Sequence, residues 1–279
     1  MKIDHVSIGW SDLRVLQDEF AAAGMATEYG GPHSSGQTHM SVLGFRDGSY
    51  IELISTVRPK TETAIWKKLI EGDGGPCAWC VAVDDIAEEV AKARRLGIPA
   101  SGPSDYTRKR PDGVLVEWEL GFLGDGEAGS TLPFLIKDKT PREFRVKPSP
   151  SVAGSSASLR GIGTVVLAVQ DLKASSSLFQ RFYGWHEPEI SREHMVGATL
   201  ASFAGSPVIL VTPDGRGWLS ERLAAFGPSP CAFLIDADDL DAAGRRYPLG
   251  PRQGWFDGKK LNWVQPLKEK GIMLGVLGR

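Results

Sequence analysis

Apolar residues recur with period two, as in strands, along some stretches of this chain and at helical spacing along others, and these stretches follow one another in the same order four times. In the first round, Ile3–Trp10 alternates with period two, which predicts a strand with His5 on its polar face. Asp12 supplies helix-capping chemistry, and apolar residues then recur at helical spacing over Leu13–Ala23. A strand near Met25–Tyr29 and a hairpin complete the round. The predicted order is therefore one strand, one helix and three further strands.

The hairpin, Gly36–Ser55, combines an apolar face with two side chains that can do chemistry. An Asp-Gly pair at 47–48 is a strong signal for a two-residue turn between strands. With that turn, Leu43 pairs with Glu52, and the alternation of side chains places His39 on the face of Glu52. A carboxylate in a buried strand needs a partner or a metal ion. The pattern therefore predicts a candidate site on this face.

The same order returns three more times along the chain. The four rounds open with IDHVSIGWSDL, CAWCVAVDDI, GTVVLAVQDL and AFLIDADDL, each an apolar strand followed by an aspartate that can begin a helix. This internal repeat predicts an α+β protein built from four tandem βαβββ units. A Pro-, Ser-, Ala- and Gly-rich tract at Lys147–Ser158 has little to bury, which is typical of a linker. We therefore expect a first half at 1–143, a linker at 144–159 and a second half at 160–279.

Composition narrows the class of protein. The net charge of −2 gives no electrostatic basis for binding nucleic acid or an acidic membrane surface. No apolar run approaches the roughly 20 residues that span a bilayer, and the first residues lack the features of a signal peptide. Three cysteines argue against a disulfide framework, and Cys77 and Cys80 lie in an apolar run, as core residues would. These features predict a soluble, cytoplasmic, globular protein.

The repeats resemble the vicinal oxygen chelate superfamily, which includes glyoxalases, bleomycin-resistance proteins and extradiol dioxygenases. Within it, the first half is similar to the glyoxalase-like domain group through IDHVSIGWSDL, GPHSSGQTHMSVLGFRDGSYIELI and LPFLIKDKTP. The resemblance implies that the units pair into two open, cup-shaped mixed β-sheets with helices outside. It also implies an enzyme of lyase, isomerase or dioxygenase type that acts on a small organic substrate, and it is compatible with a homodimer.

The superfamily commonly holds a divalent metal between a first-strand histidine and a last-strand glutamate. Carried over to this sequence, these residues are His5 and Glu52. The other units depart from the pattern: Trp79 and Phe134 stand at the two positions in the second unit, and Thr164 stands at the histidine position in the third. A site with two ligands from each of two units is therefore not expected.

The predicted register of the hairpin adds His39 to the pair. His5, His39 and Glu52 would form a two-histidine, one-carboxylate set, which suits Fe, Mn, Ni or Zn with positions open for substrate oxygens. Glu52 and His39 are then the expected catalytic residues, with Glu52 able to leave the ion and act as a base. His33, in the adjacent loop, is expected to face the substrate.

Three other functions stay open. Without a metal, Glu52 could be a general base with a raised pKa, oriented by His5. The protein could instead bind an aromatic small molecule without catalysis, as an antibiotic-sequestering protein does. In either case Trp79, Trp118 and Phe134 are expected to line the cup and bind the substrate or ligand, although the same residues could fill a core. If both cups are filled, the protein is a scaffold.

Two further segments could bind a ligand. Tyr106–Gly113 is a basic stretch that we expect to be a loop, and Arg108–Arg110 within it could be solvated or could hold an anion. Trp255, Phe256 and Trp263 could line a pocket in the second half, which has no ligand pair of its own. The sequence does not choose between these roles.

Overall fold

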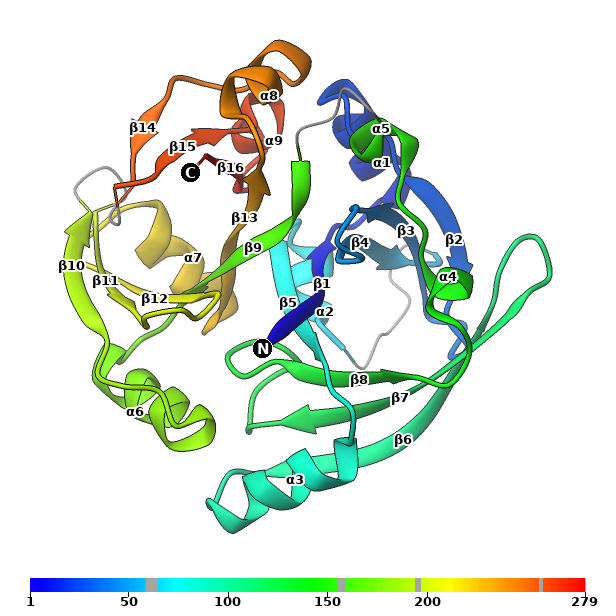
Figure 1. Ribbon diagram of the computed structural model, residues 1–279, viewed down its shortest axis with the longest axis horizontal. Helices are drawn as coiled ribbons and strands as arrows, with labels where there is room; N and C mark the ends of the chain where they lie inside the picture. Colours follow the sequence, from blue (N-terminus) through cyan, green and yellow to red (C-terminus); the bar gives the residue numbers. More distant parts are fainter. Residues whose placement is uncertain (59–64, 155–158, 194–196, 256–257, 279) are drawn as a thin grey trace.

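The computed structural model describes residues 1–58, 65–154, 159–193, 197–255 and 258–278. Two eight-stranded mixed sheets lie side by side, and each curls into a half-barrel (Figure 1). The first sheet takes its strands from the part of the chain before residue 139, and the second takes them from the part after residue 158. The predicted α+β class and the two cup-shaped sheets are confirmed.

The elements follow the chain in the predicted order within each half. The first half contains β1 (Lys2–Gly9), α1 (Leu13–Ala22), β2 (Glu28–Pro32), β3 (Thr38–Gly44), β4 (Tyr50–Thr56), α2 (Lys67–Glu71), β5 (Gly75–Ala82), α3 (Ile86–Arg95), β6 (Ala100–Lys109), β7 (Leu115–Leu123) and β8 (Phe134–Asp138). Two short helices follow, α4 (Arg142–Arg145) and α5 (Pro150–Ala153). The second half contains β9 (Leu159–Ala168), α6 (Leu172–Tyr183), β10 (Glu189–Glu193), β11 (Ala198–Ser202), β12 (Val208–Pro213), α7 (Trp218–Phe226), β13 (Ser229–Ala237), α8 (Leu240–Arg246), β14 (Gln253–Gly254), β15 (Lys260–Trp263), α9 (Gln265–Glu269) and β16 (Leu274–Gly278).

Each sheet is a pair of βαβββ units joined through their first strands. The strand orders are β2-β3-β4-β1-β5-β8-β7-β6 and β10-β11-β12-β9-β13-β16-β15-β14. The first strands pair antiparallel with each other, and each pairs parallel with the last strand of its own unit. Four helices begin after an aspartate whose side chain accepts hydrogen bonds from backbone N–H groups: Asp12, Asp85, Asp171 and Asp239. The repeat in the sequence is therefore the architecture of the molecule.

Most of the core lies between the two sheets. β1 and β5 turn one apolar face toward β9, β13 and α6 of the second half. Trp79 of β5 is fully buried there and stacks on Phe179 of α6, with ring centroids 6.4 Å apart. The predicted substrate-binding role of Trp79 is wrong, because Trp79 pairs with Val6 and so faces away from His5. Ala78 corresponds to His5, since both lie seven positions before a capping aspartate.

The loop of the β3–β4 hairpin holds three residues, not the predicted two. Phe45 N donates to the Ser49 carbonyl oxygen at 2.8 Å, and within the loop Gly48 alone has a positive φ, +87°. Asp47 Oδ1 accepts from both N and Oγ of Ser49 at 2.7 Å. These contacts favour a type I turn followed by a glycine bulge over the two-residue turn, which needs positive φ at both of its residues.

The longer loop shifts the register by one residue. Glu52 pairs with Val42 rather than with Leu43, and His39 pairs with Ser55. Because side chains alternate across a strand, His39 lies on the face opposite to Glu52, the face that α1 covers. The predicted position of His39 beside Glu52 is therefore wrong.

Other segments also differ from the prediction. β6 pairs with β7 as far as Lys109, so the first part of the predicted loop at 106–113 is a strand. The tract predicted as a linker contains α5, whose Val152 is fully buried, while residues 155–158 lie outside the described residues. Cys77 and Cys80 are buried, as predicted. Within the described residues, no helix is both long and apolar enough to cross a membrane.

Candidate functional site

The concave face of the first sheet encloses a cavity of about 270 Å³. Its wall is mainly aromatic and comes from four strands and the residue before α2: Tyr50, Trp66, Tyr106, Trp118 and Phe134. The same wall carries the polar side chains of His5, His33, Thr38, Glu52 and Arg145. The structure thus places His33, Trp118 and Phe134 on this wall, and their binding of a substrate stays a prediction.

Glu52 is a buried carboxylate at the middle of β4, with 6% of its surface exposed. The parallel pairing of β1 with β4 sets Ser7 opposite Glu52, and Ser7 Oγ donates to Glu52 Oε2 at 2.8 Å. His33 Nε2 lies 3.3 Å from Glu52 Oε1. Burial alone would raise the pKa of Glu52, but the hydrogen bonds from His33 and Ser7 and the charges on His33 and His5 lower it to about 2. The predicted raised pKa is therefore wrong, and Glu52 is ionised.

His33 is held between Glu52 and its own loop. Its Nδ1 lies 2.8 Å from Thr38 Oγ1, and its backbone N donates to the Thr38 carbonyl oxygen at 2.9 Å. Because Glu52 is ionised and can only accept, Nε2 of His33 must carry the hydrogen that lies between them. The ring is therefore fixed in orientation at the cavity wall, next to a negative charge.

His5 is the second histidine of the wall, and Asp4 fixes its orientation. A β-bulge in β1 interrupts the pairing with β5 at Asp4, which lets these consecutive side chains meet. Asp4 Oδ1 lies 2.7 Å from His5 Nδ1. The ring stacks on Tyr50 at 4.6 Å between centroids and meets Phe134 edge-on at 5.2 Å. Since Nδ1 is bonded to Asp4, Nε2 is the nitrogen that can act toward the cavity.

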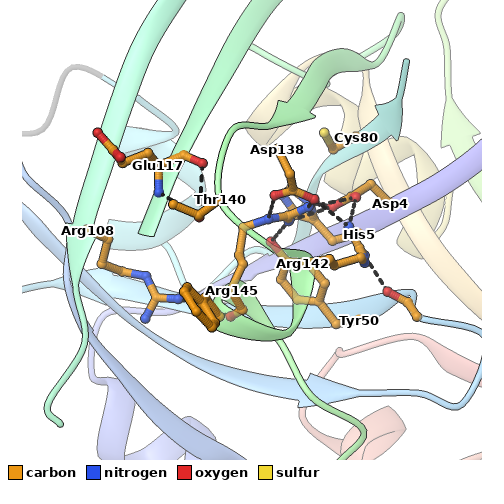
Figure 2. Close-up of polar contacts among 12 residues, drawn as sticks. Asp4, His5, Tyr50, Cys80, Arg108, Glu117, Asp138, Thr140, Arg142 and Arg145 are labelled. Carbon is orange, nitrogen blue, oxygen red and sulfur yellow. Dashed lines mark hydrogen bonds and ion pairs between the residues drawn. The ribbon is translucent and has the colours of Figure 1, made fainter. Parts of the chain in front are cut away.

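Asp4 in turn belongs to a buried ion-pair network, which Figure 2 shows between β1, β8 and α4. Arg145 donates from Nη1 to Asp4 Oδ1 at 2.8 Å, from Nη2 to Asp4 Oδ2 at 2.9 Å and from Nη1 to Tyr50 Oη at 2.9 Å. It also pairs with Asp138, and Arg142 pairs with Asp4. Burial alone would raise the pKa of Asp4, but Arg145 and His5 hold it well below its ordinary value. Asp4 is therefore ionised, and His5 Nδ1 carries the hydrogen.

A divalent metal, which the resemblance implies, needs ligand atoms that converge on one point. Within the described part of the chain, one group of three side chains has its ligand atoms within 4.8 Å of one another: Asp4, His5 and Cys80. Asp4 is already paired with two arginines, and burial raises the pKa of the Cys80 thiol well above its ordinary value. Both carboxylate oxygens of Asp4 are thus engaged by arginines and by His5, so this group does not fit a divalent metal.

The predicted ligand set does not fit a metal either. His5, His39 and Glu52 cannot meet on one ion, because His39 lies across the sheet from the other two. His33 lies close to Glu52, but these two residues and His5 are not a group whose ligand atoms gather within 4.8 Å. The residues of the cavity thus form two separate histidine–carboxylate pairs.

The second half does not repeat this site. Thr164 and Ile209 stand where His5 and Glu52 stand in the first half, and they line a cavity of about 380 Å³. α7 packs on the concave face, where its Leu219 joins Trp255 and Trp263 in an apolar cluster. A cavity of only about 30 Å³ remains beneath it. Phe256, predicted to line a pocket here, lies outside the described residues.

Comparisons with known proteins agree with this architecture. The structure of a hypothetical protein from Staphylococcus aureus covers 100% of this chain and 99% of its own, with a TM-score of 0.64 and 15% identity. That of a mutant 4-hydroxymandelate synthase from Streptomyces coelicolor covers 100% and 92%, with a TM-score of 0.64 and 11% identity. At these identities the likeness concerns the fold alone.

The structure of methylmalonyl-CoA epimerase from Mycobacterium tuberculosis, 19% identical, covers 43% of this chain and 88% of its own, with a TM-score of 0.38. No curated protein matches the sequence. The family model of the glyoxalase-like domain matches residues 3–183, which include the whole of the cavity wall described above. The chain therefore belongs to the glyoxalase-like domain family.

Proposed function

We propose that this protein is an enzyme that moves a proton on a small organic substrate bound in the first-half cavity. One observation carries the proposal: two histidines, each oriented by an ionised carboxylate, face the same aromatic cavity. A histidine in a fixed orientation can take and return a proton near neutral pH, which typically accelerates a reaction by about 10²–10⁴. Isomerisation and elimination both need such a step.

His5 is the proton acceptor in this proposal. Asp4 holds the hydrogen on Nδ1, so the lone pair of the ring is on Nε2. The ion pairs that Asp4 makes with Arg145 keep the carboxylate from turning away. Tyr50 and Phe134 pack on the ring and restrict its rotation. Asp4 and Arg145 are therefore positioning residues, and His5 is the catalytic residue.

His33 and Glu52 form the second histidine–carboxylate pair of the cavity wall. With a pKa of about 2, Glu52 is a weak base and stays charged through the neutral range. Its role is to hold the His33 ring in place and to put a fixed negative charge where a substrate hydroxyl or amino group can bind.

The aromatic wall favours a substrate with a flat, apolar body. Tyr106 and Trp118 stack on each other with ring centroids 6.4 Å apart, and Phe122 stacks on Phe134 at the same separation. Such surfaces bind planar groups by offset stacking or edge contacts. We therefore assign the site an aryl-substituted carbonyl compound, whose α-proton a histidine can remove.

Deuterium exchange tests this function. A set of arylpyruvates and aryl ketones is incubated with the protein in D2O, and the loss of the α-proton signal is followed by NMR. Wild-type protein should exchange at least one compound faster than buffer, and His5→Gln should lower that rate by about 10²–10⁴. His186→Gln, an exposed histidine of the second half, is the matched control. No exchange above the buffer rate, or equal rates in His5→Gln and wild type, would contradict the proposal.

A second function, binding without catalysis, is favoured by the aromatic wall itself. Trp66 and Trp118 are buried at the cavity, so a planar ligand should quench their fluorescence. Saturable quenching that is the same in wild type and His5→Gln, with no exchange of any compound, would support this function over the enzyme.

A further inference from the structure

The geometry points to a second ligand site in the first half, a pocket that binds an oxyanion group, carboxylate or phosphate, on Arg108. The pocket has a volume of about 210 Å³ and lies between β2, the β6–β7 turn and the end of α4. Four cations and two acids line it: Arg108, Arg110, Arg145, Lys147, Glu28 and Asp112.

Arg108 is a buried cation, with 2% of its surface exposed. Its Nη1 donates to the Gly30 carbonyl oxygen and its Nη2 to that of Arg145 at 3.1 Å. Its Nε is buried without a hydrogen-bond partner. Within the described residues, no carboxylate pairs with this guanidinium. An uncompensated buried charge is costly, and an anion that accepts from the remaining N–H groups would offset that cost. The solvated loop that the sequence allowed is therefore not the environment of Arg108.

Two other buried arginines show what compensation looks like in this fold. Arg145 is paired with Asp4 and Asp138. Arg222 of α7 lies between the two halves, where it donates to backbone carbonyl oxygens, including that of Pro230 at 2.7 Å. Arg145 lines the same pocket but is paired with acids. Arg222, like Arg108, donates to backbone carbonyl oxygens and leaves its Nε without a partner, but it does not line this pocket. Arg108 alone among the three combines a guanidinium without an acid partner with a place in the wall of the pocket.

The remaining charges of the pocket allow an anion to approach. Arg110 pairs with Asp112 at 2.6 Å, which cancels one acid of the wall. Lys147 is exposed at the rim, and in the described part of the chain it makes no ion pair. Glu28 is the exposed acid that opposes binding. Arg108 and Lys147 together outweigh it, and the planar guanidinium suits the two oxygens of a carboxylate or phosphate.

Titration with simple anions tests the site. Inorganic phosphate and acetate are added separately to the purified protein at constant ionic strength, with chloride as the balancing anion, and binding is followed by thermal shift and calorimetry. At least one anion should bind saturably. Arg108→Gln should weaken that binding by roughly tenfold or more, and Lys147→Gln by a few fold. Lys109→Gln removes the same charge from the exposed neighbour of Arg108 and should leave binding unchanged.

The two anions separate the ligand classes. Tighter binding of phosphate identifies a phosphorylated ligand, and tighter binding of acetate identifies a carboxylate. Saturable binding of neither anion would overturn the inference. If Arg108→Gln does not fold, Lys147→Gln decides alone, and equal binding by Lys147→Gln and Lys109→Gln would overturn it.

Discussion

Glu52→Gln should remove a stabilising contribution that depends on pH. The pKa of Glu52 is about 2 in the folded protein, against an ordinary value of 4.5. Because the folded-state pKa is the lower one, the charged form stabilises the fold fully above pH 4.5, and this contribution is lost as the pH falls toward 2. With about 1.4 kcal/mol for each pKa unit, the difference corresponds to about 3 kcal/mol, of which about 2 kcal/mol is lost by pH 3.

The assay is urea unfolding followed by circular dichroism at pH 3, 4, 5 and 7. The free energy of unfolding of wild type should exceed that of Glu52→Gln at pH 7, and the gap should narrow by about 2 kcal/mol by pH 3. Glu28→Gln, which changes an exposed glutamate of the same half, should follow the wild-type curve. Parallel curves for wild type and Glu52→Gln would refute the reasoning, because they would mean that Glu52 has the same pKa in the folded and unfolded chain.

Two further predictions concern the packing around the site. Arg145→Met should lower the free energy of unfolding by about 3–5 kcal/mol, because it leaves the Asp4 carboxylate buried with fewer partners. Urea unfolding at pH 7 measures this loss. A change within about 0.5 kcal/mol would mean that the ion-pair network does not stabilise the fold. Trp79→Ala should lower the free energy of unfolding by about 3–5 kcal/mol and leave ligand quenching intact. Trp118→Ala should reduce the quenching to the part that comes from Trp66, at a smaller cost in stability. Loss of quenching in Trp79→Ala would instead place Trp79 at the cavity.

The fold could be predicted because its signals are local and repeated. An apolar strand followed by a capping aspartate occurs four times, and each occurrence constrains the same unit. The alternation in the hairpin points to Glu52, and the resemblance to the superfamily adds His5. The error at His39 arose from one loop residue, because a strand that slips by one position turns every side chain to the other face.

The rest of the site depends on contacts that no local pattern reveals. Asp4 meets His5 only because a bulge interrupts the alternation of β1. Arg145 comes from a single helical turn after β8, and nothing in its neighbourhood connects it with β1. The place of Tyr50 on the cavity wall could be predicted from the sequence, since Tyr50 lies two positions before Glu52 in the same strand and must share its face.

The most direct test of the proposed chemistry is proton exchange by protein from which metals have been removed. Wild-type protein is treated with a chelator, its content of Fe, Mn, Ni and Zn is measured, and exchange of the best aryl carbonyl compound is followed in D2O. The mechanism through His5 and Asp4 predicts that the metal-free protein keeps its full rate and that His5→Gln loses it. A rate that vanishes on metal removal and returns when one of these ions is added would contradict it.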